Sequence, residues 1–400
     1  MEKIRVENLT KIFGNHPEQA LKRIAQGKSK SEIFAETKQT VGVHDASFTV
    51  NEGEILVIMG LSGSGKSTLV RCLNRLIEPT AGRVVINGVD VTALPEQELR
   101  AFRQQHLGMV FQNFALFPHR TVCENTEFGL EVQGVGPADR REKALRALEQ
   151  VGLKGQEDQL PSQLSGGMQQ RVGLARALAL DPDIMLMDEA FSALDPLIRR
   201  DMQDELLDLQ DRVQKTIVFI SHDLDEAIKL GDRIVLMKDG AIVQEGTAEE
   251  ILTNPANDYV ARFVEDVDMS KVITAESVMK KALAMAYYPT DGPKTALRKM
   301  EKAGISSIFV RKERHLEGLV TAEDAALAAK RGDKNLDRII QRNIVKVTLD
   351  TPAIDLFPLL GQMSYPVAVV GDDDRLKGVV VKGSLLAGIA ASLQTEENDA

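Results

Sequence analysis

Tryptophan is absent from the 400-residue chain, aromatic residues make up only 4% of it, and Cys72 and Cys123 are its two cysteines. The cysteines form neither a CxxC pair nor part of a metal-ligand pattern, which argues against a disulfide framework and against a zinc site. We interpret both as small hydrophobic core residues.

Long hydrophobic runs and an excess of positive charge are also lacking. No segment approaches the roughly 20 apolar residues of a membrane-spanning helix, and residues 1–5 lack the apolar core of a signal peptide. We therefore expect a cytoplasmic protein that reaches a membrane only through a partner. The net charge of −10 argues against nucleic acid as the main partner, although local basic patches remain open.

The overall composition, 43% hydrophobic and 27% charged, is typical of a soluble α/β protein, and the length predicts two or three domains. Residues 4–8 and 43–50 alternate as short strands do, and residues 54–59 form an apolar strand that runs into a glycine-rich turn. Between the first two strands, the segment at about 16–40 predicts two short amphipathic helices broken by Gly27. The sequence does not distinguish between two roles for this segment, surface decoration and a docking element.

Helices and strands alternate farther along the chain. A helix begins near Pro95, where acidic residues follow the proline and suit the helix dipole. The later apolar strands are at 184–187, 216–220 and 234–237. This alternation predicts a parallel sheet.

A domain boundary is indicated by turn-forming and charged residues at 253–258 and 264–268. Beyond it, two similar units of roughly 60 residues follow one another, because Gly292-Pro293 matches Thr351-Pro352 and residues 316–320 match residues 376–380. The repeat predicts a pseudo-symmetric pair that buries its apolar faces together. We assign the parts as a first domain at 1–268, a second at 269–392 with repeats at about 274–332 and 343–392, and an acidic, disordered tail at 393–400.

A glycine-rich run between the strand at 54–59 and a helical run at 69–76 has the context of a phosphate loop. Backbone N–H groups of such a loop cradle phosphate oxygens, and the helix start adds positive charge. Lys66 is expected to reach the β and γ phosphates, and Ser67 to ligate Mg²⁺. The candidate nucleotide-binding residues of the run are Gly60, Ser62, Gly63, Ser64, Gly65, Lys66, Ser67 and Thr68.

Two carboxylates, Asp188 and Glu189, end the apolar strand at 184–187. At the end of a strand, Asp188 is placed to hold Mg²⁺ through water, and Glu189 to polarise the attacking water as a general base. Either residue alone is compatible with an ordinary surface acid. Together with the phosphate loop they indicate nucleotide hydrolysis.

Between these two motifs lies Leu164-Ser165-Gly166-Gly167-Met168-Gln169-Gln170-Arg171, at the start of a predicted helix. Ser165 and two glycine N–H groups there can form an anion site. At this point the sequence resembles the ABC ATPase family over residues 1–266. The resemblance implies a RecA-like core with a helical subdomain, ATP and Mg²⁺ as ligands, and a homodimer in which Ser165, Gly166 and Gly167 of one subunit contact the γ phosphate held by the other.

The resemblance also implies roles for residues outside these motifs. Phe13 would stack on adenine, and Gln112 would link Mg²⁺ and the attacking water to the transporter contact. Asp195, in the run Ser192-Ala193-Leu194-Asp195, would cross the dimer interface. His222 would contact the γ phosphate and orient the water, so that Glu189, His222 and Gln112 form the catalytic set.

Longer runs at 58–65, 74–80, 114–120 and 187–199 are similar to the ATPase of bacterial glycine betaine and proline betaine importers. That family carries a C-terminal pair of CBS modules, which fits the repeat. The resemblance implies integral-membrane permease subunits and a substrate-binding protein or domain as partners. It places the ATPase at the cytoplasmic face of the inner membrane, as a peripheral protein.

In CBS modules a Gly-apolar-apolar-Thr-x-x-Asp run often binds a nucleotide ribose. The first copy keeps Thr321 and Asp324, whereas the second has Val381 and Ser384 instead. This departure argues against ordinary adenosine binding. A cyclic di-nucleotide as ligand, and a purely packing and dimerisation role for the pair, both remain open.

Taken together, the motifs predict an ATPase that drives import of glycine betaine or a related osmoprotectant and is regulated through its CBS pair by ionic strength or a nucleotide. An importer of another solute, such as choline, carnitine or an amino acid, is the alternative within the family. A soluble ABC ATPase of translation or DNA repair usually has two cassettes or a long coiled-coil insertion, and this chain has neither. A purely regulatory binding module is the third alternative.

Overall fold

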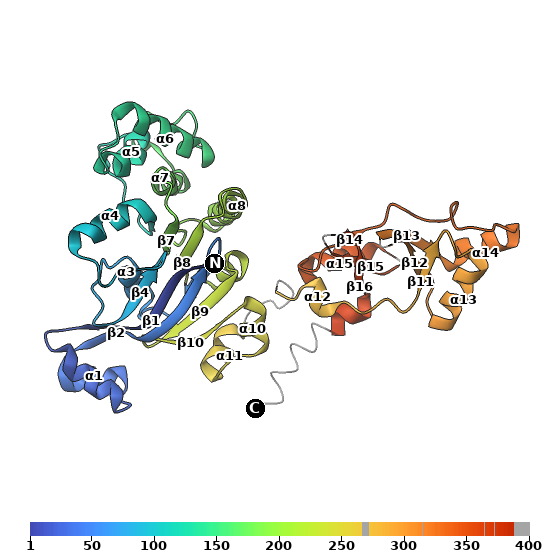
Figure 1. Cartoon of the computed structure of the whole chain (residues 1–400), viewed down its shortest axis with the longest axis horizontal. Helices are drawn as coiled ribbons and strands as arrows, with labels where there is room; N and C mark the ends of the chain where they lie inside the picture. Colours follow the sequence, from blue (N-terminus) through green and yellow to red (C-terminus); the bar gives the residue numbers. More distant parts are fainter. Residues whose placement is uncertain (266–271, 314, 364, 372, 388–400) are drawn as a thin grey trace. The chain divides into compact units, whose positions relative to one another are not determined.

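The computed structural model describes residues 1–265, 272–313, 315–363, 365–371 and 373–387. The chain divides into two compact units, residues 1–267 and 268–400 (Figure 1). The expected acidic tail at 393–400 lies outside the described residues. Within the described ranges, no helix is both long and apolar enough to cross a membrane.

The first unit contains a six-stranded sheet. Its strands are β3 (Ile55–Met59), β6 (Leu107–Phe111), β7 (Ile184–Asp188), β8 (Thr216–Ile220), β9 (Arg233–Lys238) and β10 (Ala241–Gly246). The order is β10-β9-β3-β8-β7-β6, and every neighbouring pair is parallel except β10 and β9. β3, β7 and β8 are mostly apolar and buried at every residue, as parallel strands covered on both faces are. The prediction of a parallel sheet is confirmed.

A second, antiparallel sheet in this unit has the order β2-β1-β4-β5. It consists of β1 (Glu2–Phe13), β2 (Thr40–Asn51), β4 (Ala81–Ile86) and β5 (Val89–Asp90). β1 and β2 are longer than the sequence predicts, because their alternation is interrupted by irregular pairing, for example between Val6 and Leu9. The length of these two strands carries Phe13 and Thr40 to the same end of the sheet, where they pair with one another.

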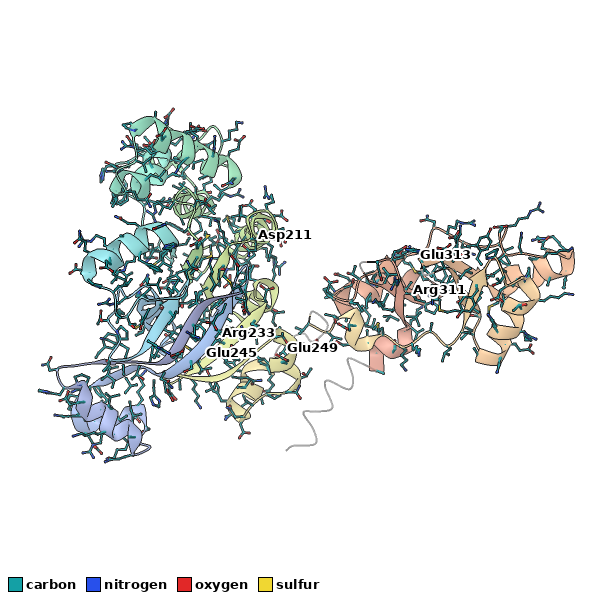
Figure 2. The ribbon with its side chains drawn as sticks, in the orientation of Figure 1. Asp211, Arg233, Glu245, Glu249, Arg311 and Glu313 are labelled. Atoms are coloured by element: carbon teal, nitrogen blue, oxygen red, sulfur yellow. The ribbon has the colours of Figure 1, made fainter. Side chains whose placement is uncertain are left out.

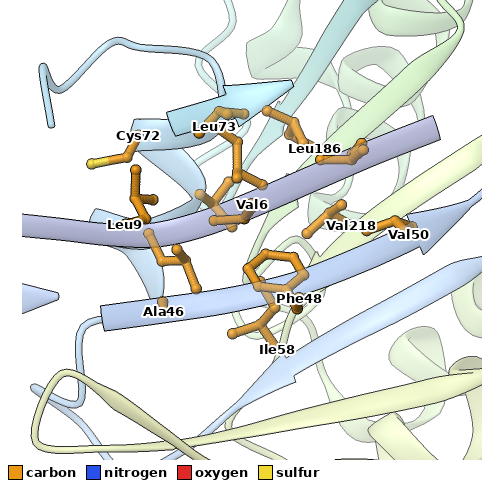
Figure 3. Packing of buried hydrophobic residues seen from close by; sticks show 14 of the residues in the cluster. Val6, Leu9, Ala46, Phe48, Val50, Ile58, Cys72, Leu73, Leu186 and Val218 are labelled. Carbon is orange, nitrogen blue, oxygen red and sulfur yellow. The ribbon is translucent and has the colours of Figure 1, made fainter. Parts of the chain in front are cut away.

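The main hydrophobic core joins the two sheets and the helix α3 (Lys66–Leu73). Val6 of β1 and Phe48 of β2 belong to one buried cluster with Ile58 of β3, Leu73 of α3 and Leu186 of β7 (Figure 3). Removing these side chains from water is the main force that holds the sheets together. Because β3 and α3 both belong to this core, the loop between them is anchored at each end.

The other helices of the first unit are α4 (Glu96–His106), α5 (Val122–Val132), α6 (Pro137–Gln150), α7 (Gly166–Leu178), α8 (Pro196–Val213), α9 (Leu224–Leu230), α10 (Ala248–Thr253) and α11 (Asp258–Val264), with a 3₁₀ turn at Pro161–Gln163. α5, α6 and α7 contact one another as a helical group (Figure 1). The turn-forming residues at 253–258 lie inside the unit, between α10 and α11. Among them, Asn257 caps α11 and accepts hydrogen bonds from the backbone N–H groups of Tyr259 and Val260.

The segment between β1 and β2 folds as α1 (Pro17–Ala25) and α2 (Lys30–Thr37), which confirms the two predicted helices. A small buried cluster attaches them to the antiparallel sheet: Ala20 of α1 and Ile33 of α2 pack with Ile12 and Val41. α2 begins with a capping box between Ser29 and Glu32. The segment is therefore ordered against the strands that flank it.

The second unit contains two three-stranded sheets of the same topology, β11-β12-β13 and β14-β15-β16. The strands are β11 (Met285–Tyr288), β12 (Ser307–Lys312), β13 (His315–Thr321), β14 (Lys346–Val347), β15 (Val367–Val370) and β16 (Leu376–Val380), and the helices are α12 (Ala275–Val278), α13 (Pro293–Ala303), α14 (Ala322–Arg331) and α15 (Ala353–Gln362). In each sheet the first pair is parallel and the second antiparallel. The predicted internal repeat is thus confirmed.

Charged side chains also connect strands at one end of the six-stranded sheet. Arg233 of β9 donates to the buried carboxylate of Glu54 at 2.8 Å and also pairs with Glu245 of β10 (Figure 2). A buried carboxylate needs such a partner, because leaving its charge unpaired away from water is costly. The pairing ties the antiparallel edge strand β10 to the parallel strands.

Both cysteines are free and buried, Cys72 in α3 and Cys123 in α5, which confirms them as core residues. Burial raises the pKa of each thiol to about 12. Since the thiolate is the reactive form, we expect the native protein at pH 8 to resist iodoacetamide, with roughly one thiol in 10⁴ ionised. Intact-mass measurement should find two adducts only after denaturation. Rapid modification of the native protein would contradict this burial.

Candidate active site

The phosphate-loop candidates from Gly60 to Gly65 lie between β3 and α3, and Lys66, Ser67 and Thr68 form the first turn of α3. Gly65 caps the start of α3 with a φ of +106°. A Cβ atom at this position would lie 2.2 Å from the carbonyl oxygen of Gly42 in β2. Only glycine satisfies both the left-handed conformation and this close backbone approach. The loop therefore crosses the antiparallel sheet in contact with its backbone.

Lys66 places its ammonium group inside the loop. Its side chain is buried, and its Nζ donates hydrogen bonds to the carbonyl oxygens of Gly60 at 2.7 Å and Leu61 at 3.2 Å. Burial lowers the pKa of Lys66, while the nearby carboxylates of Glu189 and Asp188 oppose that effect. The loop also holds the hydroxyl of Ser64, which is buried and has no hydrogen-bond partner among the described residues. The inward-facing cation of Lys66, which lines the cavity above the loop, fits an anionic group there.

A cavity of about 390 Å³ opens over the loop. Phe13 lies at its edge with its side chain partly exposed, which fits a ring that stacks on a base. The structure thereby brings Phe13 of β1 together with the loop and with Glu189. The residues that line the cavity are Phe13, Lys30, Thr40, Gly42, Ser62, Gly63, Gly65, Lys66, Ser67, Thr68 and Glu189.

Ser67, which lines this cavity, contacts Asp188 at the end of β7. The Ser67 hydroxyl donates to one carboxylate oxygen of Asp188 at 3.0 Å, and Arg71 donates to the other at 3.3 Å. Hydroxyl and carboxylate oxygens are hard ligands that suit Mg²⁺. No group of three or more His, Cys, Asp or Glu side chains in the described ranges could hold a metal alone. The oxygens present fit an ion that takes its remaining ligands from phosphate and water.

Glu189 follows β7 in a left-handed conformation, with a φ of +48°. Gln112 donates from Nε2 to a Glu189 carboxylate oxygen at 3.1 Å and to the Ser192 hydroxyl at 3.1 Å. His222 Nδ1 lies 3.8 Å from the same Glu189 oxygen. The structure therefore brings all three predicted catalytic residues together, although they come from three separate segments.

Glu226, a buried acid that sequence analysis did not identify, stabilises the loop that carries His222. Glu226 accepts hydrogen bonds from the Ser221 hydroxyl at 2.5 Å and from Gln203 at 3.0 Å. Burial raises the pKa of Glu226, and the two hydrogen bonds oppose that shift. This network fixes the backbone directly before His222.

The signature, which is the run at 164–171 expected to contact the γ phosphate, lies elsewhere in the same chain, as does Asp195. Ser165 caps α7, with its hydroxyl accepting a hydrogen bond from the Met168 N–H at 3.3 Å, and Asp195 precedes α8. None of Ser165, Gly166, Gly167 and Asp195, all within the described residues, lines the cavity over the phosphate loop. One chain thus holds the two halves of the predicted site apart.

Four residues at or beside the cavity were missed by sequence reasoning. Thr40 and Gly42 reach it because β2 pairs with β1, and Arg71 reaches Asp188 from one turn into α3. Lys30 belongs to the inserted helix α2. No local pattern marks any of the four, because each depends on which segments lie side by side.

Family models match two parts of the chain. A model described as "ABC transporter" matches residues 43–192, and a model described as "CBS domain" matches residues 265–331 and 336–391. The first range contains the phosphate loop, the signature and the acidic pair. The second falls mostly on the repeated unit.

The glycine betaine transport ATP-binding protein OpuAA of Bacillus subtilis is 57% identical to the chain over 391 residues, covering 98% of this chain and 93% of the relative. The chain belongs to the ABC transporter family. The glycine betaine/carnitine transport ATP-binding protein GbuA of Listeria monocytogenes is 53% identical, with 98% of both chains covered. As an ABC ATP-binding subunit, the chain binds ATP and is an ATPase coupled to transport, and it carries two CBS domains.

A solved ABC structure resembles the first unit. It is the dimeric, post-hydrolysis state of the ATP-binding cassette MJ0796 with ADP and Pi. It is 32% identical, has a TM-score of 0.52, and covers 61% of this chain and 98% of its own. The similarity supports the ABC cassette fold of this subunit.

The two CBS repeats of this ABC subunit differ at the predicted ribose position. In the first, the Thr321 hydroxyl bonds Asp324 at 2.7 Å, and Asp324 and Gln341 line a cavity of about 310 Å³ together with Arg331 and Arg338. In the second, the buried Ser384 hydroxyl bonds the backbone carbonyl of Val381 at 3.0 Å. At this position of the second copy, the hydroxyl is therefore bonded to the backbone of its own repeat.

We expect Gly65→Ala to weaken ATP binding at least about tenfold, because the new methyl group meets the Gly42 carbonyl and the forced left-handed conformation adds strain. Gly27→Ala is the matched control: Gly27 also has a positive φ, of +75°, but nothing lies within 4 Å of its Cβ position. Calorimetric titration with ATP measures both variants. Equal affinity in the two variants would mean that the close approach at Gly65 does not shape the site.

Proposed function

We propose that this ATPase energises the import of glycine betaine or a related quaternary-amine osmoprotectant. The observation that carries the proposal is the 57% identity with a glycine betaine transport subunit over almost the whole of both chains. Import of carnitine is the second candidate, because the relative that is 53% identical is named for both glycine betaine and carnitine. The choice of solute therefore rests on similarity alone, because the transported solute need not touch this subunit.

In the hydrolytic step we propose, Phe13 stacks on adenine and the loop N–H groups with Lys66 hold the phosphates. Glu189 takes the proton of the attacking water as a general base, and Gln112 and His222 orient that water. Mg²⁺ bound by Ser67 and Asp188, with Gln112 beside it, would neutralise charge on the β and γ phosphates. The shared contact of Gln112 and His222 with Glu189 supports these roles.

We further propose a homodimer in which the signature of one subunit completes the site of the other. Ser165, Gly166, Gly167 and Asp195 lie away from the cavity of their own chain. A second copy would bring the N-terminus of its α7, with a partial positive charge, to the γ phosphate. The dimeric state of the resembling cassette supports this arrangement.

The remaining partners are proposed from the family. The subunit would dock on integral-membrane permease subunits through the region around 112–119, at the cytoplasmic face of the inner membrane, and a substrate-binding protein or domain would deliver the solute. Gln112 joins this region directly to Glu189, which supports a link between docking and hydrolysis. Closure and reopening of the dimer would thereby reach the permease.

For the CBS pair, we propose regulation of transport by ionic strength or by a nucleotide such as a cyclic di-nucleotide. We place the ATPase domain at 1–268 and the CBS domains within 269–392, at about 274–332 and 343–392. The cavity beside Asp324, with Arg331 and Arg338, supports an anionic ligand in the first copy. The internal bond of Ser384 supports the alternative, a pair used for packing and dimerisation.

Glu189→Gln is expected to slow ATP hydrolysis by roughly 10²–10⁴-fold while ATP binding persists, because the amide cannot accept the proton of the attacking water. In cells that lack the gene, wild type should restore glycine betaine uptake at high osmolarity and this variant should not. Glu98→Gln, on the exposed face of α4, is the matched control. Normal uptake in the knockout would overturn the betaine assignment and redirect the search to carnitine.

With ATP present, the slow Glu189→Gln variant is expected to accumulate as a dimer, because the nucleotide joins the two subunits until it is split. Sedimentation with ATP, compared with ADP, measures this change. A mass that stays that of one subunit at saturating ATP would contradict completion of the site by a second copy.

A further inference from the structure

The inserted segment reaches the nucleotide cavity with one side chain. Lys30 is the first residue of α2 and lines the cavity over the phosphate loop. Its Nζ donates a hydrogen bond to the carbonyl oxygen of Gly63, within the loop itself, at 3.2 Å. A residue of the insertion therefore stands next to the position expected for the phosphates.

The position of Lys30 is set by the packing of α2. Ile33, one turn farther along the helix, is buried against Ile12 and Val41 of the strands that carry Phe13 and Thr40. The capping box before Lys30 fixes the helix start: Ser29 N–H donates to Glu32 at 2.8 Å, and Glu32 N–H donates to Ser29 Oγ at 3.3 Å. The Lys30 backbone is thus held by the same sheet that borders the cavity.

Lys30 also differs from its neighbours in charge balance. Lys28 and Arg23 both pair with Glu36 inside the insertion. In the described part of the chain, no carboxylate forms an ion pair with the Lys30 ammonium; its hydrogen bond goes to a neutral carbonyl. Lys30 is therefore a half-buried cation without a counter-ion among the described residues, and it lies at the wall of a cavity that fits an anion. Such a cation lowers the free energy of a phosphate group placed in the cavity.

We propose that Lys30 is a second phosphate-binding cation, supplied to the ATP site by the inserted helix α2. The proposal rests on the assignment of this cavity to ATP. An ammonium group has three N–H donors, so Lys30 can keep its bond to Gly63 while donating to a phosphate oxygen. The insertion is then part of the nucleotide site, a role beyond surface decoration or docking.

The test compares the affinity of the full-length protein for ATP and for adenosine by calorimetric titration. Lys30→Met keeps the length of the side chain but removes its charge, and should weaken ATP binding by about tenfold. Lys30→Arg should retain most of the affinity, because it restores the cation. Lys22→Ala, at an exposed position of α1 outside the cavity lining, is the control and should bind as wild type does. Adenosine, which has no phosphate, should bind equally to all four proteins.

Two results would overturn the role of Lys30. One is an unchanged ATP affinity in Lys30→Met, with or without a lower melting temperature, because the bond to Gly63 would then be structural only. The other is an equal loss of ATP and adenosine binding, which would indicate a distorted site. Failure of wild type itself to bind ATP would instead refute the proposed function, so the two failures are distinguishable.

Discussion

The active site depends on one close approach of backbones, where the phosphate loop crosses β2. Gly65 of the loop and Gly240 of the turn after β9 both pack on the backbone of Gly42, and a Cβ on Gly42 would in turn meet the ring of Phe13. Hydrogen bonds reinforce the crossing, since Gly240 N–H donates to the Ser64 carbonyl at 2.9 Å and His44 N–H donates to the Gly240 carbonyl at 2.7 Å. Backbone contacts of this kind exist only without side chains. They attach the antiparallel sheet, which carries Phe13, to the parallel sheet, which carries the phosphate loop.

Around this crossing, the polar groups of the phosphate loop are only partly paired among the described residues. Lys66 is buried with only carbonyl partners, Ser64 has an unused hydroxyl among the described residues, and Ser67 already contacts Asp188. A triphosphate at the loop would bring negative charge and acceptor oxygens to Lys66 and Ser67, both of which line the cavity. The acid that would act as base, Glu189, is held from the other side by Gln112 and His222. Binding groups and reacting groups therefore come from different loops at one edge of the sheet.

The repeated unit shows how two copies of one fold acquire different surfaces. The strand topology is the same in both, because the apolar positions that build β12, β13, β15 and β16 recur. The polar positions diverge: Thr321 and Asp324 stand beside a cavity in the first copy, while Ser384 is buried and bonded to its own backbone in the second. Packing constrains the fold of each copy, but it leaves the choice of binding residues free.

The sequence alone determined the features that neighbouring residues encode. The strand, glycine turn and helix around Lys66, the helix start at Ser165, the acids at the end of β7, the two helices of the insertion and the repeat all depend on local conformation and short periodicities. Only the tertiary structure decided which distant groups meet. Gln112 and His222 reach Glu189, and Lys30 reaches Gly63, because the strand order and the packing of α2 bring separate segments to one edge. The same long-range packing holds Ser165, Gly166 and Gly167 away from the cavity of their own chain. The sequence could not predict this separation, because no local pattern specifies which surface the start of a helix will face.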